Sequence, residues 1–222
     1  MIASKITDLI GNTPMLKLKM KNNDWNVFLK LEKFNPGGSM KDRMALNMIE
    51  EAEKSGQLKP GGTIIESSSG NTAIGLAIAS AIKGYHFIAV VDHHASKEKI
   101  DMIKAYGAEI VVVGDGYKAN EVAVIEREKT AKRMSEEMEN AFFPNQADNF
   151  NNRAAYIDTL ADELINDITT INSFYAAIGT GGSACGTAMG LKKRNSNTKI
   201  NVIEPDGSIL FGGLALVGTE MV

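Results

Sequence analysis

The chain has 222 residues, of which 44% are hydrophobic and 23% are charged, and its formal net charge at pH 7 is −3. That length and composition allow a sizeable buried core, built as one large domain or two small ones. The small net charge favours neither nucleic acid nor an anionic membrane surface as a partner. No signal-peptide pattern opens the sequence and no apolar run approaches the ~20 residues of a membrane span, so we expect a cytoplasmic protein.

The cysteine and histidine content argues against a disulfide framework and against a metal site. Cys185 is the single cysteine, which excludes an internal disulfide and a cysteine-based metal site. The histidines His86, His93 and His94 have no carboxylate at a useful helical spacing beside them. We therefore expect no bound metal.

Short apolar runs alternate with amphipathic stretches along the chain, which is typical of parallel β-sheet with crossover helices. Several runs are continuously apolar, as in strands that are covered on both faces. The helix predicted at 71–83 is apolar nearly all round and should be buried, while the charges of 117–139 predict an exposed helix. The predicted strands are 27–31, 63–66, 86–91, 109–113, 173–178 and 199–203. The predicted helices are 41–54, 71–83, 97–106, 117–139, 152–165 and 183–192.

The stretch 35–43, Asn-Pro-Gly-Gly-Ser-Met-Lys-Asp-Arg, places Lys41 at the start of a predicted helix. Residues 36–38 form a turn signal, and Ser39 is a natural N-cap. An ammonium group in the first helical turn opposes the helix dipole, and burial also favours the neutral amine, so both effects would lower its pKa. Lys41 is therefore a candidate nucleophile toward a carbonyl group. Taken alone, the stretch also fits a solvated surface lysine.

A polar turn at 66–71, Glu-Ser-Ser-Ser-Gly-Asn, lies between a predicted strand and the predicted buried helix. Free backbone N–H groups at a helix start, with hydroxyl groups beside them, can bind an anion such as an amino-acid carboxylate. The alternative is that Ser69 or Asn71 only caps the helix. The stretch alone favours neither interpretation.

A glycine-rich turn at 179–183, Gly-Thr-Gly-Gly-Ser, opens the last predicted helix. Glycines let the backbone approach a phosphate closely, the helix start supplies donors, and Thr180 and Ser183 add hydroxyl groups. Residues 179–184 also satisfy the dinucleotide pattern G-x-G-x-x-G/A, with Glu204 at the end of the next strand, so a nicotinamide-dependent dehydrogenase is an alternative. Such a fingerprint usually opens its domain, whereas this one stands late in the chain. A tight turn without a ligand is the third possibility.

Together these stretches resemble the cysteine synthase and cystathionine β-synthase family, which are fold-type II pyridoxal-phosphate enzymes. The resemblance runs from about residue 6 to residue 213. Its motifs are 11–14 (Gly-Asn-Thr-Pro), which is similar to the family's opening motif, 35–43 to its lysine segment, 68–72 to its substrate-carboxylate loop and 179–183 to its phosphate loop.

The resemblance implies a fold and a division into domains. The fold would be α/β, with two interleaved parallel-sheet domains as in tryptophan synthase β-like proteins. Residues 40–145 would form most of a smaller N-terminal subdomain, and residues 1–39 with 146–222 the larger one. Family members continue beyond the part that resembles 204–213, and 214–222 do not match that continuation. The larger subdomain is therefore expected to be incomplete, with apolar faces exposed along strand 173–178 and with a homodimer or another chain covering them.

The resemblance also assigns roles to single residues. Lys41 would be the catalytic residue, which holds pyridoxal 5′-phosphate through its amine and later removes a proton from the substrate. Asn71 would bond the cofactor's ring oxygen. The cofactor phosphate would be bound by Gly179, Thr180, Gly181, Gly182 and Ser183. The substrate carboxylate would be bound by Ser68, Ser69, Asn71, Thr72 and Gln146.

The implied reaction is β-replacement on an O-activated serine, either O-acetylserine or O-phosphoserine, with sulfide as the nucleophile, so that a small amino acid is the substrate and cysteine the product. Residues 147–152 depart from the family's usual Phe-x-Asn-Pro-x-Asn, which keeps other substrates open. Residues 35–43 and 207–212 are also similar to a siderophore-pathway branch that uses an amine nucleophile to make a diaminopropionate precursor. A dehydrogenase and an inactive truncated relative are the alternatives from other classes.

Overall fold

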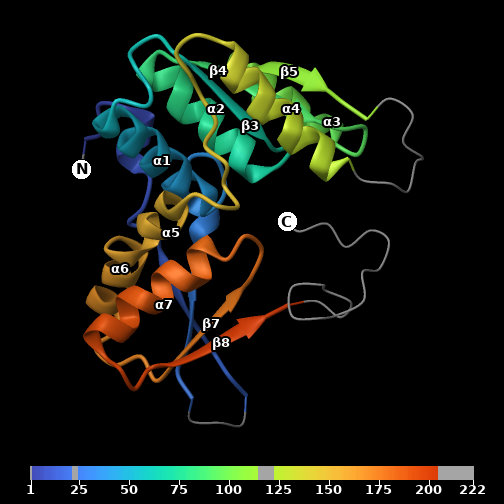
Figure 1. Cartoon of the computed structure of the whole chain (residues 1–222). Coiled ribbons are helices and arrows are strands. Elements are labelled where there is room, and N and C mark those ends of the chain that lie inside the picture. Colours follow the sequence, from blue (N-terminus) through green and yellow to red (C-terminus); the bar gives the residue numbers. More distant parts are fainter. Residues whose placement is uncertain (1, 22–24, 115–122, 205–222) are drawn as a thin grey trace.

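The computed structural model describes residues 2–21, 25–114 and 123–204. They form two groups of elements, an upper and a lower one in Figure 1, with α1 and α5 between them. The strands are β1 (Met15–Leu18), β2 (Val27–Lys30), β3 (Thr63–Ser67), β4 (His86–Val91), β5 (Glu109–Val112), β6 (Ala141–Phe142), β7 (Ser173–Ala177) and β8 (Lys199–Ile203). The helices are α1 (Lys41–Ser55), α2 (Asn71–Lys83), α3 (Lys97–Ala105), α4 (Val124–Glu137), α5 (Phe150–Ile157), α6 (Leu160–Asp167) and α7 (Gly182–Arg194), with short 3-10 helices η1 (Ile6–Leu9) and η2 (Glu32–Phe34).

The predicted strands are all confirmed to within one residue at each end, whereas β1 and β6 were missed. The helix predicted at 152–165 is instead two helices, α5 and α6, which separate at Asp158 and Thr159. The hydroxyl group of Thr159 donates to the carbonyl oxygen of Ala155, a local bond that competes with continued helix. The start of the helix predicted at 117–139, residues 117–122, lies outside the described residues, as do the segments 207–212 and 214–222.

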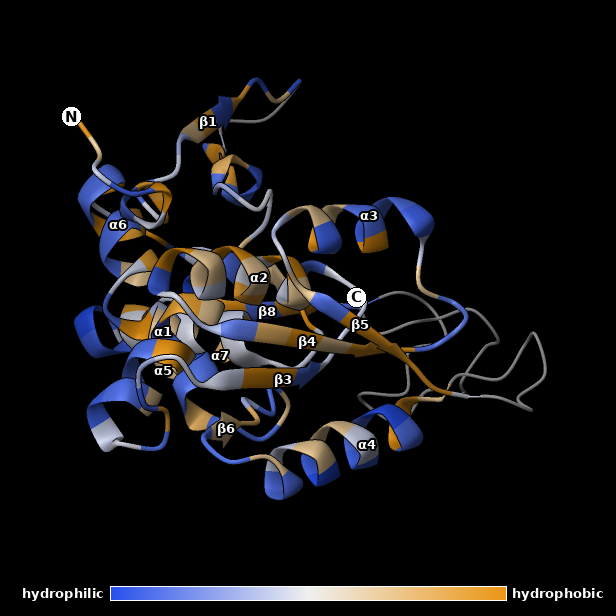
Figure 2. Cartoon of the chain, turned by 90° about the horizontal axis from the view of Figure 1, so that it is seen from above, coloured by the Kyte–Doolittle hydropathy of each residue, from blue (hydrophilic) through white to orange (hydrophobic). Residues whose placement is uncertain are grey.

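A four-stranded parallel sheet with the order β5-β4-β3-β6 forms the upper group. Successive side chains of a strand point to opposite faces, and the apolar residues follow that rule. Ile64 and Phe87 pack with α2, while Ile65 and Ile88 pack on the face of Ala131 from α4. Figure 2 shows α2 and α3 on one side of this sheet and α4 on the other. The predicted burial of helix 71–83 is confirmed over residues 72–80, and α4 is exposed as expected.

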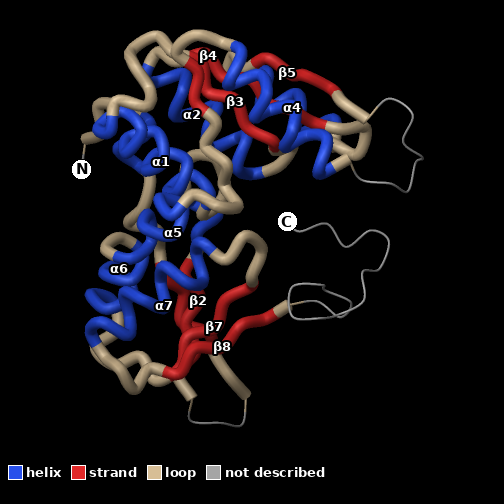
Figure 3. The backbone as a smooth tube through the Cα atoms, viewed as in Figure 1, coloured by secondary structure: helices blue, strands red, loops and turns tan. Residues whose placement is uncertain are grey.

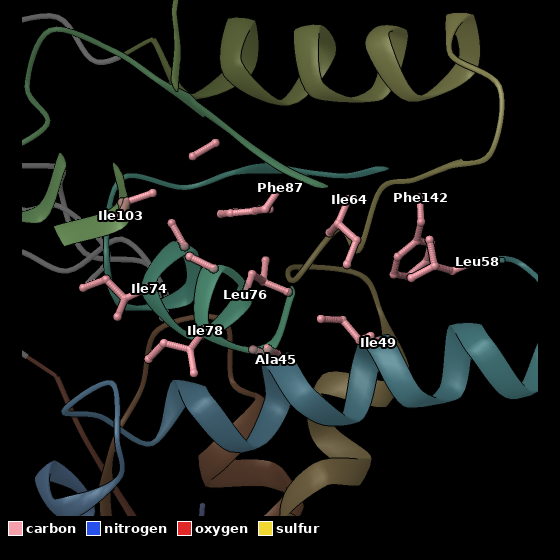
Figure 4. Close-up of a cluster of buried hydrophobic side chains, with 14 of the residues drawn as sticks. Ala45, Ile49, Leu58, Ile64, Ile74, Leu76, Ile78, Phe87, Ile103 and Phe142 are labelled. Atoms are coloured by element: carbon pink, nitrogen blue, oxygen red, sulfur yellow. The ribbon is translucent and has the colours of Figure 1, made fainter. Parts of the chain in front are cut away.

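Helix α1 connects the two groups because it presents apolar residues to both. Ala45 and Ile49 belong to the cluster around α2, which Figure 4 shows in close-up. Met44 and Met48 lie in the next stripe of the same helix and pack with Tyr156 of α5. Burying both stripes leaves α1 little freedom to turn, so its first residue, Lys41, is held by both cores.

The lower group holds a parallel pair, β7 and β8, joined by α7, and an antiparallel pair, β1 and β2 (Figure 3). The antiparallel pairing of β2 with β1 was not predicted. The sequence of a single strand does not show whether its neighbour runs parallel or antiparallel to it, and β1 itself was missed. Tyr175 is 62% exposed and Ile203 is 55% exposed, so apolar side chains of this pair are uncovered, as expected for strand 173–178. The α/β class with parallel sheets is confirmed. Within the described ranges, no helix is both long enough and apolar enough to cross a bilayer.

Candidate active site

Lys41 is the first residue of α1, as predicted, but Met40 rather than Ser39 occupies the N-cap position. The Ser39 hydroxyl oxygen nevertheless accepts the Lys41 backbone N–H at 3.2 Å, which explains why the sequence suggested a cap one residue early. The buried Tyr156 donates its hydroxyl hydrogen to the carbonyl oxygen of Met40 at 2.9 Å and so ties this helix start to α5.

The Lys41 side chain is half-buried, and burial lowers the pKa of its amine. No described residue forms a hydrogen bond or an ion pair with its Nζ. An amine that is partly desolvated and lacks an anionic partner is easier to deprotonate than a surface lysine, and the neutral form is the nucleophile and the base. Lys41 therefore differs in this structure from a fully solvated surface lysine.

A close approach of α1 and α2 brings Lys41 toward Asn71. The approach is at Gly75, where a Cβ atom would lie 3.2 Å from the Lys41 carbonyl oxygen and 3.1 Å from the Cβ atom of Ala45. Asn71 precedes Gly75 by one helical turn on the same face of α2. The absence of a side chain at Gly75 thus lets the starts of both helices share one corner of the molecule.

The turn between β3 and α2 leaves its helix start free of side-chain caps. Gly70 is the N-cap of α2, and no side chain accepts a capping hydrogen bond there, so the interpretation of Ser69 or Asn71 as a cap is wrong. The Ser68 hydroxyl oxygen accepts the Gly70 N–H at 3.3 Å inside the turn. The first N–H groups of α2, beginning with those of Asn71 and Thr72, have no intrahelical partner and can bind an anion.

Gln146 lies against this turn, as the resemblance implied. The Thr72 hydroxyl group donates to the Gln146 Oε1 atom at 2.6 Å. A hydroxyl group has one hydrogen to donate, so this bond uses it and leaves the Nε2 group of Gln146 as the amide's donor. Thr72 would then contribute its backbone N–H to an anion, while its side chain orients Gln146.

Glu66 is a buried carboxyl group behind the turn that sequence reasoning did not single out. Its Oε1 atom accepts the Ser67 N–H at 2.9 Å and its Oε2 atom accepts the Gln146 N–H at 3.2 Å, so it holds both sides of the anion site. Burial raises the pKa of Glu66 to about 7. A charged residue directly after the apolar pair Ile64 and Ile65 of a predicted buried strand is the sequence signal that could have identified it.

Lys99 of α3 was also missed. Its Nζ atom lies 3.7 Å from the position that a Cβ atom would take on Gly70, directly beside the helix start. No described carboxylate forms an ion pair with it, in contrast to Lys97 on the same helix, which pairs with Asp101. A cation at the positive end of a helix is unfavourably placed unless an anion lies nearby.

The glycine-rich turn between β7 and α7 forms the second candidate anion site. Gly181 is the N-cap of α7 and has a φ angle of +83°, a backbone conformation that residues other than glycine rarely adopt. Thr180 and Ser183 are half-buried at the turn, and the Thr180 Oγ1 atom lies 3.1 Å from the Nδ2 atom of Asn152. Gly182 is buried against the Asn152 side chain, and a Cβ atom there would overlap it. Gly179 precedes the turn and is half-buried.

The remaining candidates for chemistry are a metal site and the single cysteine, Cys185. Across the described stretches of the chain, no three side chains from His, Cys, Asp and Glu lie together as a metal site. Cys185 is exposed in the first turns of α7, and its backbone N–H donates to the Gly181 carbonyl oxygen at 2.8 Å. It therefore helps to close the first helical turn through its backbone.

The pyridoxal-phosphate dependent enzyme family matches residues 6–219. A putative cysteine synthase of Sinorhizobium fredii is 46% identical over 213 residues, which cover 96% of this chain and 63% of that relative. A probable cysteine synthase of Bacillus subtilis is 43% identical over 231 residues, which cover 99% of this chain and 72% of that relative.

Solved structures give the same result. A hydrogen sulfide-producing enzyme from Fusobacterium nucleatum has a TM-score of 0.89 and 37% identity, covering 97% of this chain and 70% of that one. The O-acetylserine dependent cystathionine β-synthase from Helicobacter pylori has a TM-score of 0.88 and 36% identity, with the same coverage. The chain thus spans about two thirds of the length of these relatives. The family match over residues 6–219 favours a pyridoxal-phosphate dependent enzyme over the nicotinamide-dependent dehydrogenase. The chain belongs to the pyridoxal-phosphate dependent enzymes, within the cysteine synthase and cystathionine β-synthase family.

Proposed function

We propose that the protein catalyses β-replacement on an O-activated serine with sulfide as the nucleophile. The observation that carries the proposal is the position of Lys41. Its half-buried amine, which pairs with no described residue, belongs to the first residue of α1, where α1 packs closely on Gly75 of α2. The two helix starts that can bind anions are linked to each other by hydrogen bonds through Gln146 and Asn152. One anion site suits the carboxylate of an amino acid and the other suits a phosphate group.

The residues present fit pyridoxal 5′-phosphate. The turn of Gly179, Thr180, Gly181, Gly182 and Ser183 would hold its phosphate, because Gly181 has the positive φ angle that such a cradle requires and α7 begins directly after it. Asn71 would bond the ring oxygen. When bound, the cofactor withdraws electrons from the substrate and so stabilises negative charge at its Cα atom.

Lys41 would perform two tasks in sequence. Its neutral amine would hold the cofactor through the aldehyde group, and in its free form it would take the proton from the substrate Cα atom. Burial favours that neutral form. Its position is held by the Tyr156 hydroxyl group on one side and the Gly75 approach on the other.

The substrate carboxylate would lie at the β3–α2 turn. The hydroxyl groups of Ser68 and Ser69, the N–H groups of Asn71 and Thr72, and the Nε2 group of Gln146 are the donors available there. Lys99 adds a positive charge at the same turn. This donor set selects an α-amino acid but leaves acetate and phosphate equally acceptable as the group that departs from Cβ.

The names of the relatives support sulfide over an amine as the nucleophile, since they are cysteine synthases and a hydrogen sulfide-producing enzyme. The segment 207–212, on which the amine alternative partly rests, lies outside the described residues. We also propose the subdomain division at residues 40–145, which separates the β3–β6 sheet from the β7–β8 pair. The homodimer and the cytoplasmic location stay predictions.

Absorbance spectroscopy tests the proposal. The wild-type protein mixed with pyridoxal phosphate should turn yellow, and borohydride should bleach that colour. Lys41→Ala should lack the imine absorbance, so borohydride should cause no such bleaching. Lys97→Ala is the matched control, because Lys97 is exposed on α3 and forms an ion pair with Asp101. Steady-state assays should then show sulfide consumed with O-acetylserine or O-phosphoserine. Full absorbance in Lys41→Ala would contradict the lysine assignment, and turnover with an amine but not with sulfide would favour the alternative reaction. A protein that binds the cofactor without any turnover would support the inactive relative.

A further inference from the structure

We propose that Asn152 is a positioning residue that couples the carboxylate site to the phosphate site, in the sense that the shape of both sites depends on its one side chain. The proposal rests on the proposed function and adds a residue to it. Asn152 lies on α5, which belongs to neither of the two turns.

The amide of Asn152 reaches both sites at once. Its Nδ2 group donates to the carbonyl oxygen of Gln146 at 2.7 Å and to the hydroxyl oxygen of Thr180 at 3.1 Å. These two bonds use both of its amide hydrogens. On the far side, Gln146 accepts the Thr72 hydroxyl hydrogen, so a continuous series of hydrogen bonds runs from the start of α2 to the glycine-rich turn.

The packing around Asn152 fixes its orientation. The residue is 3% exposed, and its Oδ1 atom is buried without a hydrogen-bond partner, close against Gly182. A buried amide oxygen that forms no hydrogen bond costs free energy. The two hydrogen bonds that the Nδ2 group of Asn152 donates offset that cost. A change of rotamer would break both of these bonds.

The chemical consequence is selectivity at two distant groups of the ligands. Thr180 is held with its hydroxyl oxygen accepting from Asn152, which leaves its hydrogen free to donate to a phosphate at the turn. Gln146 is held by its backbone at one end and by Thr72 at the other, which aims its Nε2 group at the carboxylate. Loss of Asn152 should therefore reduce recognition of the phosphate and of the carboxylate together.

Two affinity ratios measure this coupling. The first compares pyridoxal phosphate with pyridoxal, which lacks the phosphate, by absorbance titration of the 222-residue chain. The second compares L-serine with L-serinamide, which lacks the carboxylate, by the concentration that half-shifts the spectrum of the bound cofactor. We expect Asn152→Ala to lower both ratios about tenfold, which corresponds to the loss of roughly one hydrogen bond at each end.

Matched variants separate coupling from general loosening. Asn151→Ala should change neither ratio, because the hydrogen bonds of Asn151 at this place are made by its backbone. Thr180→Val should lower only the phosphate ratio, since the bond from Asn152 to Gln146 remains. Asn152→Ser, which keeps one donor, should give intermediate ratios and serves if Asn152→Ala does not fold by circular dichroism.

The outcomes distinguish the coupling from the proposed function. Normal wild-type ratios that stay unchanged in Asn152→Ala, or that change at one end only, overturn the coupling and leave the proposed function intact. A wild-type chain that shows no preference for pyridoxal phosphate contradicts both. Equal losses in Asn151→Ala and Asn152→Ala would also overturn the coupling, because they would reflect loosening of α5 as a whole.

Discussion

The two strand–turn–helix units of the candidate active site, β3–α2 and β7–α7, solve the same problem in different ways. Each begins in a parallel strand pair and exposes the free N–H groups of a helix start. In the first unit, side chains shape the turn, with Ser68 bonding inside it and Glu66 holding it from behind. In the second unit, missing side chains shape the turn, because Gly181 takes a positive φ angle and Gly182 makes room for Asn152.

The difference continues along the helices. Helix α2 is buried from residue 72 to 80, and it needs one close approach, at Gly75. Helix α7 approaches α5 at three glycines one turn apart: Gly182 lies against the Asn152 side chain, and Gly186 and Gly190 lie against backbone carbonyl groups of α5. The carboxylate unit thus depends on hydrogen bonds and apolar burial, and the phosphate unit on the absence of Cβ atoms. The same substitution should therefore have unequal effects in the two units.

The largest expected effect is that of Gly186→Ala compared with Gly75→Ala. A Cβ atom at Gly186 would overlap the carbonyl oxygen of Arg153, whereas one at Gly75 would meet the Lys41 carbonyl oxygen at a tight but tolerable 3.2 Å. We expect Gly186→Ala to lower the free energy of unfolding by about 3 kcal/mol or more, and Gly75→Ala by about 1 kcal/mol, since alanine regains helix propensity. Urea denaturation measures both. Equal losses would show that α7 can move away from α5 as easily as α1 from α2.

The next effect is a pH dependence that only the carboxylate unit should show. Because the pKa of Glu66 is raised to about 7 in the folded state, that state holds the proton more tightly than the unfolded chain, with its ordinary value of 4.5. The contribution of Glu66 to the free energy of unfolding should therefore be fully present below its unfolded pKa. It should be lost as pH rises from about 4.5 to 7, by up to about 3 kcal/mol.

Glu66→Gln, which mimics the protonated carboxyl group, should remove that part of the slope in urea titrations across this range. Burial also raises the pKa of Asp42, to about 6, so Asp42 adds a pH dependence of stability in the same direction as Glu66. That part is present in both the wild type and Glu66→Gln. Glu163 contributes in another window, because its pKa is lowered to about 2 and its stabilisation is lost as pH falls from 4.5. An unchanged slope in Glu66→Gln would contradict the assignment of the pH dependence to Glu66.

A third comparison begins with Gly181→Ala, which tests the backbone of the phosphate turn. A side chain at a φ angle of +83° costs roughly 1–2 kcal/mol, and we expect it to appear as a cofactor affinity about tenfold weaker. Gly70→Ala is the counterpart in the carboxylate turn, where φ is −117° and the added methyl group would meet only the Lys99 Nζ atom, so cofactor affinity should hardly change. Absorbance titration with pyridoxal phosphate compares the two. Similar losses in both variants would mean that the positive φ angle is not what limits the phosphate turn.

The sequence predicted most strands and helices and both anion-binding turns, because each of these depends on residues that are neighbours in the chain. Hydrophobic period predicted the strands of the main sheet, and turn chemistry predicted where α2 and α7 begin. It missed β1 and β6, which are two to four residues long and carry too little pattern. It also missed Glu66, Lys99 and Asn152, because their roles depend on segments that meet only in space. The contact from Asn152 to Thr180, for instance, spans 28 residues.

The smallest effect is expected from Lys99, the cation beside the carboxylate turn. Its Nζ atom lies near Gly70 without a described carboxylate partner, and it is half-buried, so its attraction for a bound anion is only partly screened. We expect Lys99→Met, which keeps the length of the side chain, to raise the half-saturating concentration of L-serine about threefold, while pyridoxal phosphate binds as before. The change should shrink when salt is raised from 50 mM to 500 mM, because salt weakens a charge interaction and leaves hydrogen bonds to Gln146 in place. Lys97→Met on the same helix is the matched control, since that lysine already pairs with Asp101. If Lys99→Met instead weakened the cofactor and the amino acid equally at every salt concentration, Lys99 would be supporting the packing of α3 against the turn, and the carboxylate unit would depend on its hydrogen bonds alone.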